Sequence, residues 1–308
     1  MCAIFGLLDY KGNLTAAQKL HLVRELGTAA EIRGTDATGI AYFQRDKLCI
    51  QKAPKPAHKM KYRIPAEVQY IMGHTRMTTQ GKASKNQNNH PFPGKAGDQK
   101  FALAHNGVLT NDWNLRFSEI LPKTDVETDS FVAVQLIEKQ KEVSFQSLKT
   151  MAEKVEGSFT FTILDQDNNL YFVKGENPLT IYHYPKLGVY LYASTSEILD
   201  NALFSLGMEQ IAYEMIQPEI GDILKINNQG NQETASFEPY DNFGPWFTFV
   251  PPARKRYATQ NHVTEQEYIQ AVKTVAVFHG FEADFIDGLI SDGYTTDDIE
   301  EMIYNNRY

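Results

Sequence analysis

The chain opens Met1-Cys2-Ala3-Ile4-Phe5-Gly6-Leu7-Leu8, the stretch that governs the expected fold. The apolar run Ala3–Leu8 is short and is followed by the turn signal Lys11-Gly12-Asn13, which predicts a buried strand. Because Cys2 is small, we expect Met1 to be removed, leaving a thiol and a free α-amine on one residue. Such an amine has an ordinary pKa of about 7.7–8.0, so Cys2 is a candidate nucleophile that carries its own base. The alternative is a small buried hydrophobe behind a retained Met1.

The composition describes a globular protein. With 308 residues, 42% of them hydrophobic, the chain can bury one large core or two modest ones. Two cysteines, Cys2 and Cys49, form no disulfide framework, which favours a reducing cytoplasm. We find neither an apolar run of about 18 residues nor a leader, so no membrane association is expected. The net charge of -8 argues against non-specific nucleic-acid binding.

The acidic charge is concentrated at the end of the chain. Beyond Asn261, ten acidic residues are opposed only by Lys273 and Arg307. Pro251-Pro252-Ala253-Arg254-Lys255-Arg256 is typical of a stiff basic linker. We therefore predict a main domain over 1–250, a linker over 251–260 and an acidic three-helix unit over 261–308. The three short helices are expected at 264–278, 282–290 and 296–304.

Within the main domain, strands come both before and after helices. Helices are predicted over 14–32, 131–141, 147–155 and 198–206. Strands are predicted over 68–73 and 101–104, each leading into a polar motif, and further strands run between 158 and 226. Because the two types do not alternate strictly, the pattern favours an α+β fold over a doubly wound sheet.

Taken singly, the polar motifs have ordinary structural explanations. Arg33 fits a surface salt bridge, Arg76 a structural ion pair, and Asn106-Gly107 a common turn. Asp129 lies where a helix N-cap is expected. The spacing of the nearby histidines matches no common zinc pattern, so no metal and no cofactor are expected.

The order of the motifs changes the interpretation. The chain carries an N-terminal Cys-x-Ile-Phe-Gly, then Arg-Gly-x-Asp-x-x-Gly, Gly-His-Thr-Arg, Asn-His-Pro, His-Asn-Gly and Thr-Asp. From Met1 to about Ile226 this series resembles the class II glutamine amidotransferases, which are N-terminal-nucleophile (Ntn) hydrolases. The resemblance implies a four-layer αββα sandwich, here followed by the small helical unit. Its later part is thinner, since the family's Ala-Ser-acid signature is matched only partly by Ala193-Ser194-Thr195-Ser196-Glu197.

The resemblance assigns catalytic roles to three residues. Cys2 would attack the side-chain amide of L-glutamine, with its α-amine moving the proton. The Asn106 side chain and the Gly107 backbone N–H would stabilise the oxyanion. Ammonia would leave first, and water would then release glutamate from a thioester.

It also implies a binding set and a supporting set. Arg76 would hold the α-carboxylate of glutamine and Asp129 its α-ammonium, while Thr79 and His90 would shape the pocket. Arg33 and Asp36 would support the nucleophile from a neighbouring loop. Met77 and Gln80 depart from the residues that many relatives have, as do Ala3 and Phe131.

Three functions follow for comparison. The first is a glutaminase that delivers ammonia to an unknown acceptor on a separate enzyme or subunit; a homodimer is left open. The second keeps the Ntn machinery but acts on another γ-glutamyl compound or amide, and the changes at Met77 and Gln80 motivate it. The third is a non-catalytic glutamine-binding or scaffolding module that recruits a partner through its acidic tail.

Overall fold

The computed structural model describes residues 2–208, 210–240, 269, 273, 283–291, 295 and 299. The chain divides into two units, Met1–Asn242 and Phe243–Tyr308. The predicted linker at 251–260 and most of two of the three predicted C-terminal helices lie outside the described residues.

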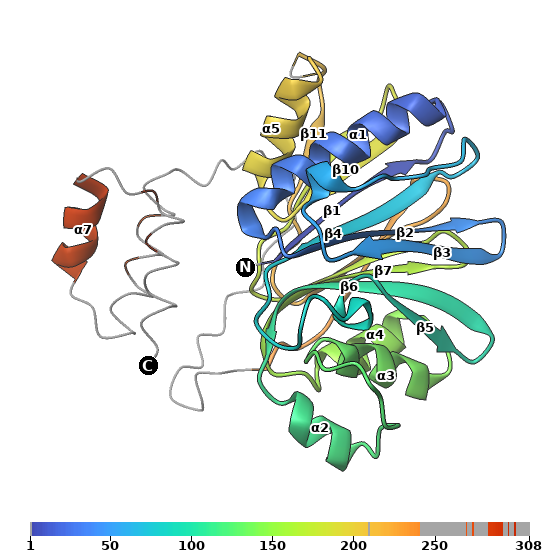
Figure 1. Ribbon diagram of the computed structural model, residues 1–308, viewed down its shortest axis with the longest axis vertical. Coiled ribbons are helices and arrows are strands. Elements are labelled where there is room, and N and C mark those ends of the chain that lie inside the picture. The colour runs from blue at the N-terminus through green and yellow to red at the C-terminus, as the bar shows by residue number, and fades with distance from the viewer. Residues whose placement is uncertain are drawn as a thin grey trace. The chain divides into compact units, whose positions relative to one another are not determined.

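The first unit contains two antiparallel sheets (Figure 1). Sheet A has the strand order β11-β9-β10-β1-β4-β2-β3. Its strands are β1 (Ala3–Asp9), β2 (Ala37–Gln44), β3 (Lys47–Ala53), β4 (Tyr70–Arg76), β9 (Thr180–Tyr184), β10 (Val189–Ala193) and β11 (Glu214–Ile216). The strand predicted at the start of the chain therefore lies in the middle of this sheet, paired with β10 and β4.

Sheet B has the order β13-β12-β8-β7-β6-β5. Its strands are β5 (Phe92–Ala96), β6 (Gln99–Leu109), β7 (Gly157–Asp165), β8 (Leu170–Lys174), β12 (Asp222–Ile226) and β13 (Gln232–Ser236). The long strand β6 pairs with β5 on one side and β7 on the other. Strands β3 and β5 are both edge strands, each at the end of its own sheet.

Helices cover the outer face of each sheet (Figure 1). Helices α1 (Ala16–Ala29) and α5 (Ser196–Ser205) pack on sheet A. Helices α3 (Phe131–Gln140) and α4 (Phe145–Ala152) pack on sheet B, and the short α2 (Asp112–Ser118) lies beside α3. The short 3-10 turns are η1 (Ala30–Arg33), η2 (Ala57–Lys59) and η3 (Asn86–Asn88). The expected α+β class and four-layer αββα order are confirmed.

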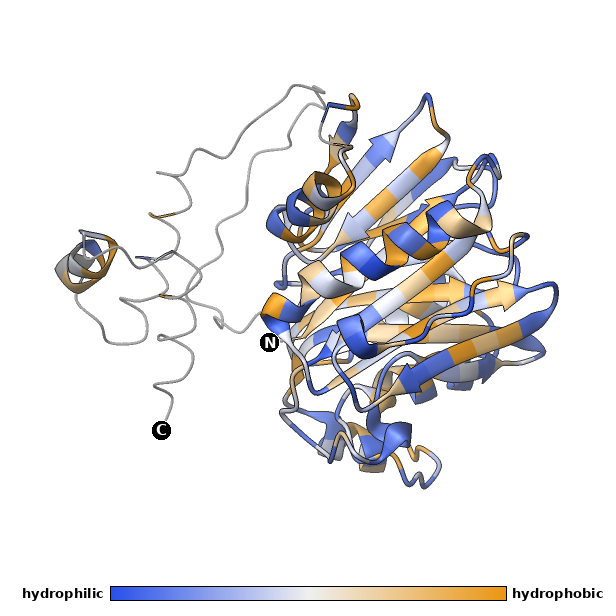
Figure 2. Ribbon diagram, turned by 45° about the horizontal axis from the view of Figure 1, so that its top comes forward, coloured by the Kyte–Doolittle hydropathy of each residue, from blue (hydrophilic) through white to orange (hydrophobic). Residues whose placement is uncertain are grey.

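Side-chain alternation along the strands builds three separate cores. In β1, Phe5 and Leu7 face the helices on sheet A, whereas Ile4 and Leu8 face the other sheet. In β6, Leu103 faces α3 and α4 on the opposite outer side. Successive side chains point to opposite faces, so a strand between two buried layers must be apolar throughout. Figure 2 shows orange apolar bands along the strands, interrupted by paler and blue ones.

Two strands are longer than their sequences predict. Strand β4 continues through His74-Thr75-Arg76, and β6 continues through His105-Asn106-Gly107, although both motifs are polar. Strand β4 is paired with β1 as far as Thr75 and with β2 as far as Arg76, whereas the polar motif of β6 is paired with β7 alone. Ladder hydrogen bonds therefore extend the strands past the point where the apolar pattern ends.

The second unit is described through one helix and a few flanking residues. Helix α7 (Ala283–Ser291) falls on the second of the three predicted helices. Its Ile286 is buried together with Ile299, and Lys273 forms an ion pair with Asp287. Across the described residues of both units, the helices are too short or too polar to cross a membrane.

Candidate active site

Ser194 joins the strand that carries Cys2 to the strand that carries Asn106. The Ser194 hydroxyl oxygen accepts the backbone N–H of Ile4 at 3.0 Å and the Nδ2–H of Asn106 at 3.3 Å. The Ser194 backbone N–H donates to the Ile4 carbonyl at 3.0 Å. Ser194 and Asn106 are both fully buried. The beginning of β1 and the middle of β6 are therefore held in one fixed relation across the two sheets.

Cys2 lies immediately before β1 and is partly buried. Its Sγ–H donates to the Met77 carbonyl at 3.4 Å, and its own carbonyl accepts Arg33 Nε–H at 3.0 Å. Burial raises the pKa of the Cys2 thiol, while the Arg76 cation lowers it and the Asp129 carboxylate raises it further. Both charged groups are therefore close enough to Cys2 to act on its ionisation.

Gly107 follows Asn106 in a backbone conformation that favours glycine. Its φ is +140°, and an added Cβ would lie 2.0 Å from the Ser158 carbonyl oxygen on β7. Any larger residue would have to displace the neighbouring strand. Tight packing of β6 on β7 thus requires glycine at this position.

The Arg76 guanidinium is buried at the end of β4 and already has three acceptors. Nη1 donates to Asn89 Oδ1 at 2.7 Å, and Nη2 donates to the carbonyls of Gln80 and Gly81. A guanidinium has five N–H groups. Among the described residues, Nε–H and the second Nη1–H are left for another acceptor. In this arrangement Arg76 also anchors the loop over 77–81.

Asp129 is buried, and its carboxylate accepts hydrogen bonds from the end of β6 and from the adjacent Ser130. Its Oδ2 accepts the Leu109 backbone N–H at 2.6 Å, and its Oδ1 accepts the Ser130 hydroxyl at 3.3 Å. Its own backbone N–H donates to Gln80 Oε1 at 2.9 Å. Gln80 therefore connects Asp129 to the loop that Arg76 anchors.

The other predicted site residues, Arg33, Asp36, Thr79 and His90, differ in how far they are buried. Asp36 Oδ2 accepts the Thr78 backbone N–H at 2.7 Å, so Asp36 and Arg33 contact the Met77 loop and Cys2 respectively. Thr79 is exposed on that loop. His90 is buried between the rings of His74 and Phe92, with ring centroids 4.3 Å away in each case.

Part of the chain is similar to known proteins. Residues 74–201 match the model of a glutamine amidotransferase domain family. Over this segment, which is less than half of the chain, the protein resembles a class II glutamine amidotransferase domain. The glutamine–fructose-6-phosphate aminotransferase (isomerizing) of Chlamydia muridarum is 33% identical over 54% of this chain, and that of Streptococcus pyogenes is 31% identical over 59%. The chain covers only 27% and 30% of those two proteins.

Solved structures share the fold of the amidotransferase domain. Glutamine phosphoribosylpyrophosphate amidotransferase from B. subtilis superposes with a TM-score of 0.59 at 20% identity. The match covers 77% of this chain and 49% of that one. An allosteric regulatory enzyme of purine biosynthesis gives a TM-score of 0.57, also at 20% identity. At this level of identity the likeness establishes the fold of the domain.

Three residues of the amidotransferase domain make contacts that the motifs did not predict. Ser194 is the bridge between β1 and β6, Asn89 holds the Arg76 guanidinium, and Gln80 connects to Asp129. Asn89 belongs to the Asn-His-Pro motif and Ser194 to the partial Ala-Ser-acid match. A signal was therefore present in each motif, but the hydrogen-bond partners are distant in sequence.

Three histidines of this domain are buried: His74, His90 and His105. His74 Nε2 bonds to the His105 carbonyl at 2.9 Å, and His105 Nδ1 bonds to Ser130 Oγ at 2.8 Å. Among the described residues, neither ring nitrogen of His90 has a hydrogen-bond partner. Burial lowers the pKa of all three, that of His74 to about 3. The folded domain therefore keeps these rings neutral.

Stability should fall as the pH drops below the ordinary histidine pKa of about 6.5. Since the folded-state pKa is lowered, the full stability is present above 6.5 and is lost as the pH falls toward that folded value. Each such histidine contributes a slope of about 1.4 kcal/mol per pH unit in this window. Urea unfolding between pH 7.5 and 5 should show a smaller slope for His90→Phe than for the parent. The exposed His21→Gln serves as the control, and an unchanged slope in His90→Phe would contradict the assignment.

Proposed function

We propose that this chain hydrolyses L-glutamine to glutamate and ammonia, with Cys2 as the nucleophile. The observation that carries the proposal is the Ser194 bridge, because it fixes Asn106 relative to the strand that presents Cys2. Arg76 and Asp129 supply one positive and one negative charge near the same thiol. That pair matches the two charged ends of a free amino acid.

The proposed reaction has two halves. Cys2 Sγ attacks the carboxamide carbon, and the α-amine of the processed Cys2 accepts the thiol proton and returns it to the leaving nitrogen. The C–N bond breaks, ammonia leaves and a thioester remains. Water then adds to the thioester carbonyl, the C–S bond breaks, and glutamate departs with the thiol restored.

The donors for the oxyanion are supplied by β6. Asn106 Nδ2 carries two N–H groups, and Ser194 accepts only one of them. The second is available to an oxyanion, as is the backbone N–H of Gly107 under the proposal. Preorganised donors in a buried site stabilise the tetrahedral intermediate because they need no reorganisation during the reaction.

Bidentate binding of the glutamine carboxylate by Nε and Nη2 requires a change around Arg76. Both N–H groups of Nη2 are used by the carbonyls of Gln80 and Gly81. A fork built from Nε and Nη2 therefore becomes available only when this loop releases one carbonyl. We propose that the substrate α-carboxylate takes the place of that carbonyl, which couples binding to movement of the loop.

Arg76→Lys should raise the KM for glutamine about 10- to 100-fold, with a smaller effect on kcat. Lysine keeps the charge but cannot form the planar fork, and a charge-assisted hydrogen bond contributes about 1.5–3 kcal/mol. Steady-state release of ammonia measures both constants. Arg24→Lys, at an exposed position of α1, is the matched control. An unchanged KM in Arg76→Lys would remove Arg76 from the glutamine site.

The deciding experiment is an intact-mass spectrum before and after treatment with 6-diazo-5-oxo-L-norleucine, which alkylates glutamine sites. Loss of Met1 and one adduct on Cys2 is the expected result. A free Cys2 amine without an adduct would favour another γ-glutamyl or amide substrate, to be identified in a substrate panel. A retained residue before Cys2, with saturable glutamine binding and no turnover, would favour the non-catalytic module.

We further propose that the ammonia is used by a separate acceptor enzyme and that the protein works in the reducing cytoplasm. The thiol of Cys2 needs a reducing setting to stay a nucleophile. Release of free ammonia in equal amount to glutamate, by the purified chain alone, is the expected result when no acceptor is present.

A further inference from the structure

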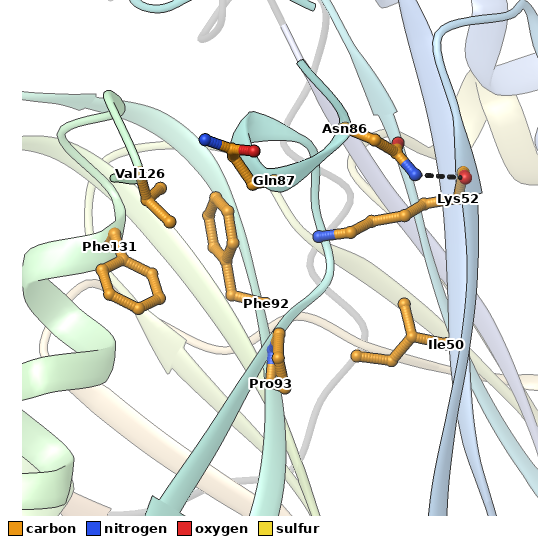
Figure 3. A pocket seen from close by; sticks show the side chains of 8 residues that line it. All are labelled: Ile50, Lys52, Asn86, Gln87, Phe92, Pro93, Val126 and Phe131. Carbon is orange, nitrogen blue, oxygen red and sulfur yellow. Dashed lines mark hydrogen bonds between the residues drawn. The ribbon is translucent and has the colours of Figure 1, made fainter. Parts of the chain in front are cut away.

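A pocket of about 400 Å³ lies beside the 86–93 segment (Figure 3). It is lined by the edge strand of each sheet, β3 and β5, and by the segment that leads into α3. Pockets that bind small molecules commonly measure about 300–1,000 Å³, so this one is large enough for a compact ligand. Cys2, Asn106 and Asp129 are not among its lining residues.

The walls of this pocket are mainly apolar and partly aromatic. Ile50 contributes from β3, Phe92 and Pro93 from β5, and Val126 and Phe131 from the other side. Figure 3 shows the rings of Phe92 and Phe131 on the same side of the space, facing the side chain of Ile50 across it. Such walls favour a flat apolar or aromatic body.

Lys52 supplies a cation at the centre of the pocket. Its ammonium donates to the carbonyls of Asn89 and Pro91, the latter at 3.1 Å, and lies 5.1 Å from the centre of the Phe92 ring. Three donors are present, so one N–H is left for a ligand. Burial, followed by the nearby Arg76 cation, lowers the pKa of Lys52 to about 8, so the group is still mainly charged at neutral pH.

This cation has no counter-ion in the described part of the chain. No carboxylate there forms an ion pair with Lys52, whereas the neighbouring Lys85 is paired with Glu127. A partly buried charge gains from a counter-ion, because removing it from water is costly. An anionic ligand would provide the missing partner.

We propose that this pocket binds a small carboxylate with an aromatic or apolar body. The carboxylate accepts the free N–H of Lys52, and the body packs against Phe92, Phe131 and Val126. Glutamate is a poor fit, since its α-ammonium would face the Lys52 and Arg76 cations and its chain offers little to the aromatic walls. The ligand is therefore distinct from the substrate and the product.

A single residue, Asn89, connects Lys52 in this pocket to Arg76, the residue proposed to bind the carboxylate of glutamine. Lys52 holds the Asn89 carbonyl, and the Asn89 side chain accepts from Arg76 Nη1 at 2.7 Å. A carboxylate that draws the ammonium toward itself weakens its bonds to the 89–91 segment, and so shifts the support of Arg76. This coupling rests on the proposed function, whereas binding itself does not.

Binding is tested with hydrocinnamate and its neutral amide, hydrocinnamamide, on the full chain labelled at isoleucine methyls. Hydrocinnamate should shift the Ile50 methyl signal and leave Ile181, buried between the sheets, unchanged. The amide should bind about 10- to 100-fold more weakly, because it lacks the charge that Lys52 receives. Equal binding of the two compounds, or no shift at Ile50, overturns the proposal.

Two variants locate the charge. Lys52→Met should abolish the preference for the carboxylate, and Lys52→Arg should retain part of it, which separates loss of charge from loss of fold. Lys47→Met, at an exposed position of the same strand, should bind like the parent. A preference that survives in Lys52→Met overturns the assignment.

The coupling has its own readout. Hydrocinnamate should change the KM for glutamine and leave kcat unaltered in the parent, with no change in Lys52→Met. An absence of glutaminase activity with intact hydrocinnamate binding would refute the proposed function and leave the pocket standing. Normal glutaminase kinetics without any hydrocinnamate binding would refute the pocket alone.

Discussion

Cys2→Ala is expected to abolish glutamine-dependent release of ammonia, lowering the rate by about 10⁴-fold or more. Alanine removes the sulfur that forms the thioester, and it is small enough to preserve processing of the residue before it. The α-amine would remain, as would Arg76 and Asp129, the two charged residues proposed to bind glutamine. Glutamine should therefore still bind, which isothermal titration calorimetry can measure beside the ammonia assay.

The matched control for this variant is the other cysteine. Cys49 lies on the edge strand β3 and is partly buried. Cys49→Ala should retain full activity and a single alkylation by 6-diazo-5-oxo-L-norleucine. Ammonia release by a folded Cys2→Ala protein at the parent rate would refute the nucleophile and, with it, the proposed mechanism.

The second large effect is expected at Asn106. Asn106→Ala removes the side-chain donor for the oxyanion, which should lower kcat about 10²- to 10³-fold with little change in KM. The loss falls mainly on kcat because the oxyanion exists only after Cys2 has attacked. Rates should be followed at a temperature where circular dichroism shows the variant to be folded.

A control of similar burial separates catalysis from packing. Asn111 is buried, accepts the Glu156 backbone N–H at 3.0 Å and donates to the Lys154 carbonyl at 2.9 Å. Asn111→Ala should lower stability because those groups lose their partner, yet kcat should stay near the parent value. Equal losses of kcat in both variants would show that the Asn106 effect is structural.

For Ser194 too, an effect on catalysis must be distinguished from an effect on packing, because Ser194 contacts Asn106 but no reacting atom in the proposed mechanism. It is a positioning residue, connecting Asn106 to the backbone of Ile4. Its influence on the rate would act through the orientation of the Asn106 amide. The order of effects expected from this geometry is Cys2 first and Asn106 second, with Ser194 acting through the latter.

The sequence by itself determined the class of fold and the positions of the motifs. The apolar run Ala3–Leu8 predicts a buried strand, and β1 lies in the middle of sheet A, with the helices on one face and sheet B on the other. The order of the motifs indicated the amidotransferase family before any geometry was known. These features are local, because strand period, turn residues and motif spacing are all properties of short segments.

The tertiary structure alone decided which side chains meet. Ser194 and Ile4 are 190 residues apart, and Asn106 is 88 residues from Ser194, so no local pattern contains their contact. The same holds for the hydrogen bond from Arg76 to Asn89 and for the pocket of Lys52, which has no ion-pair partner in the described part of the chain. Local patterns specify strands and helices, but a hydrogen bond between two strands depends on the register that all the layers reach together.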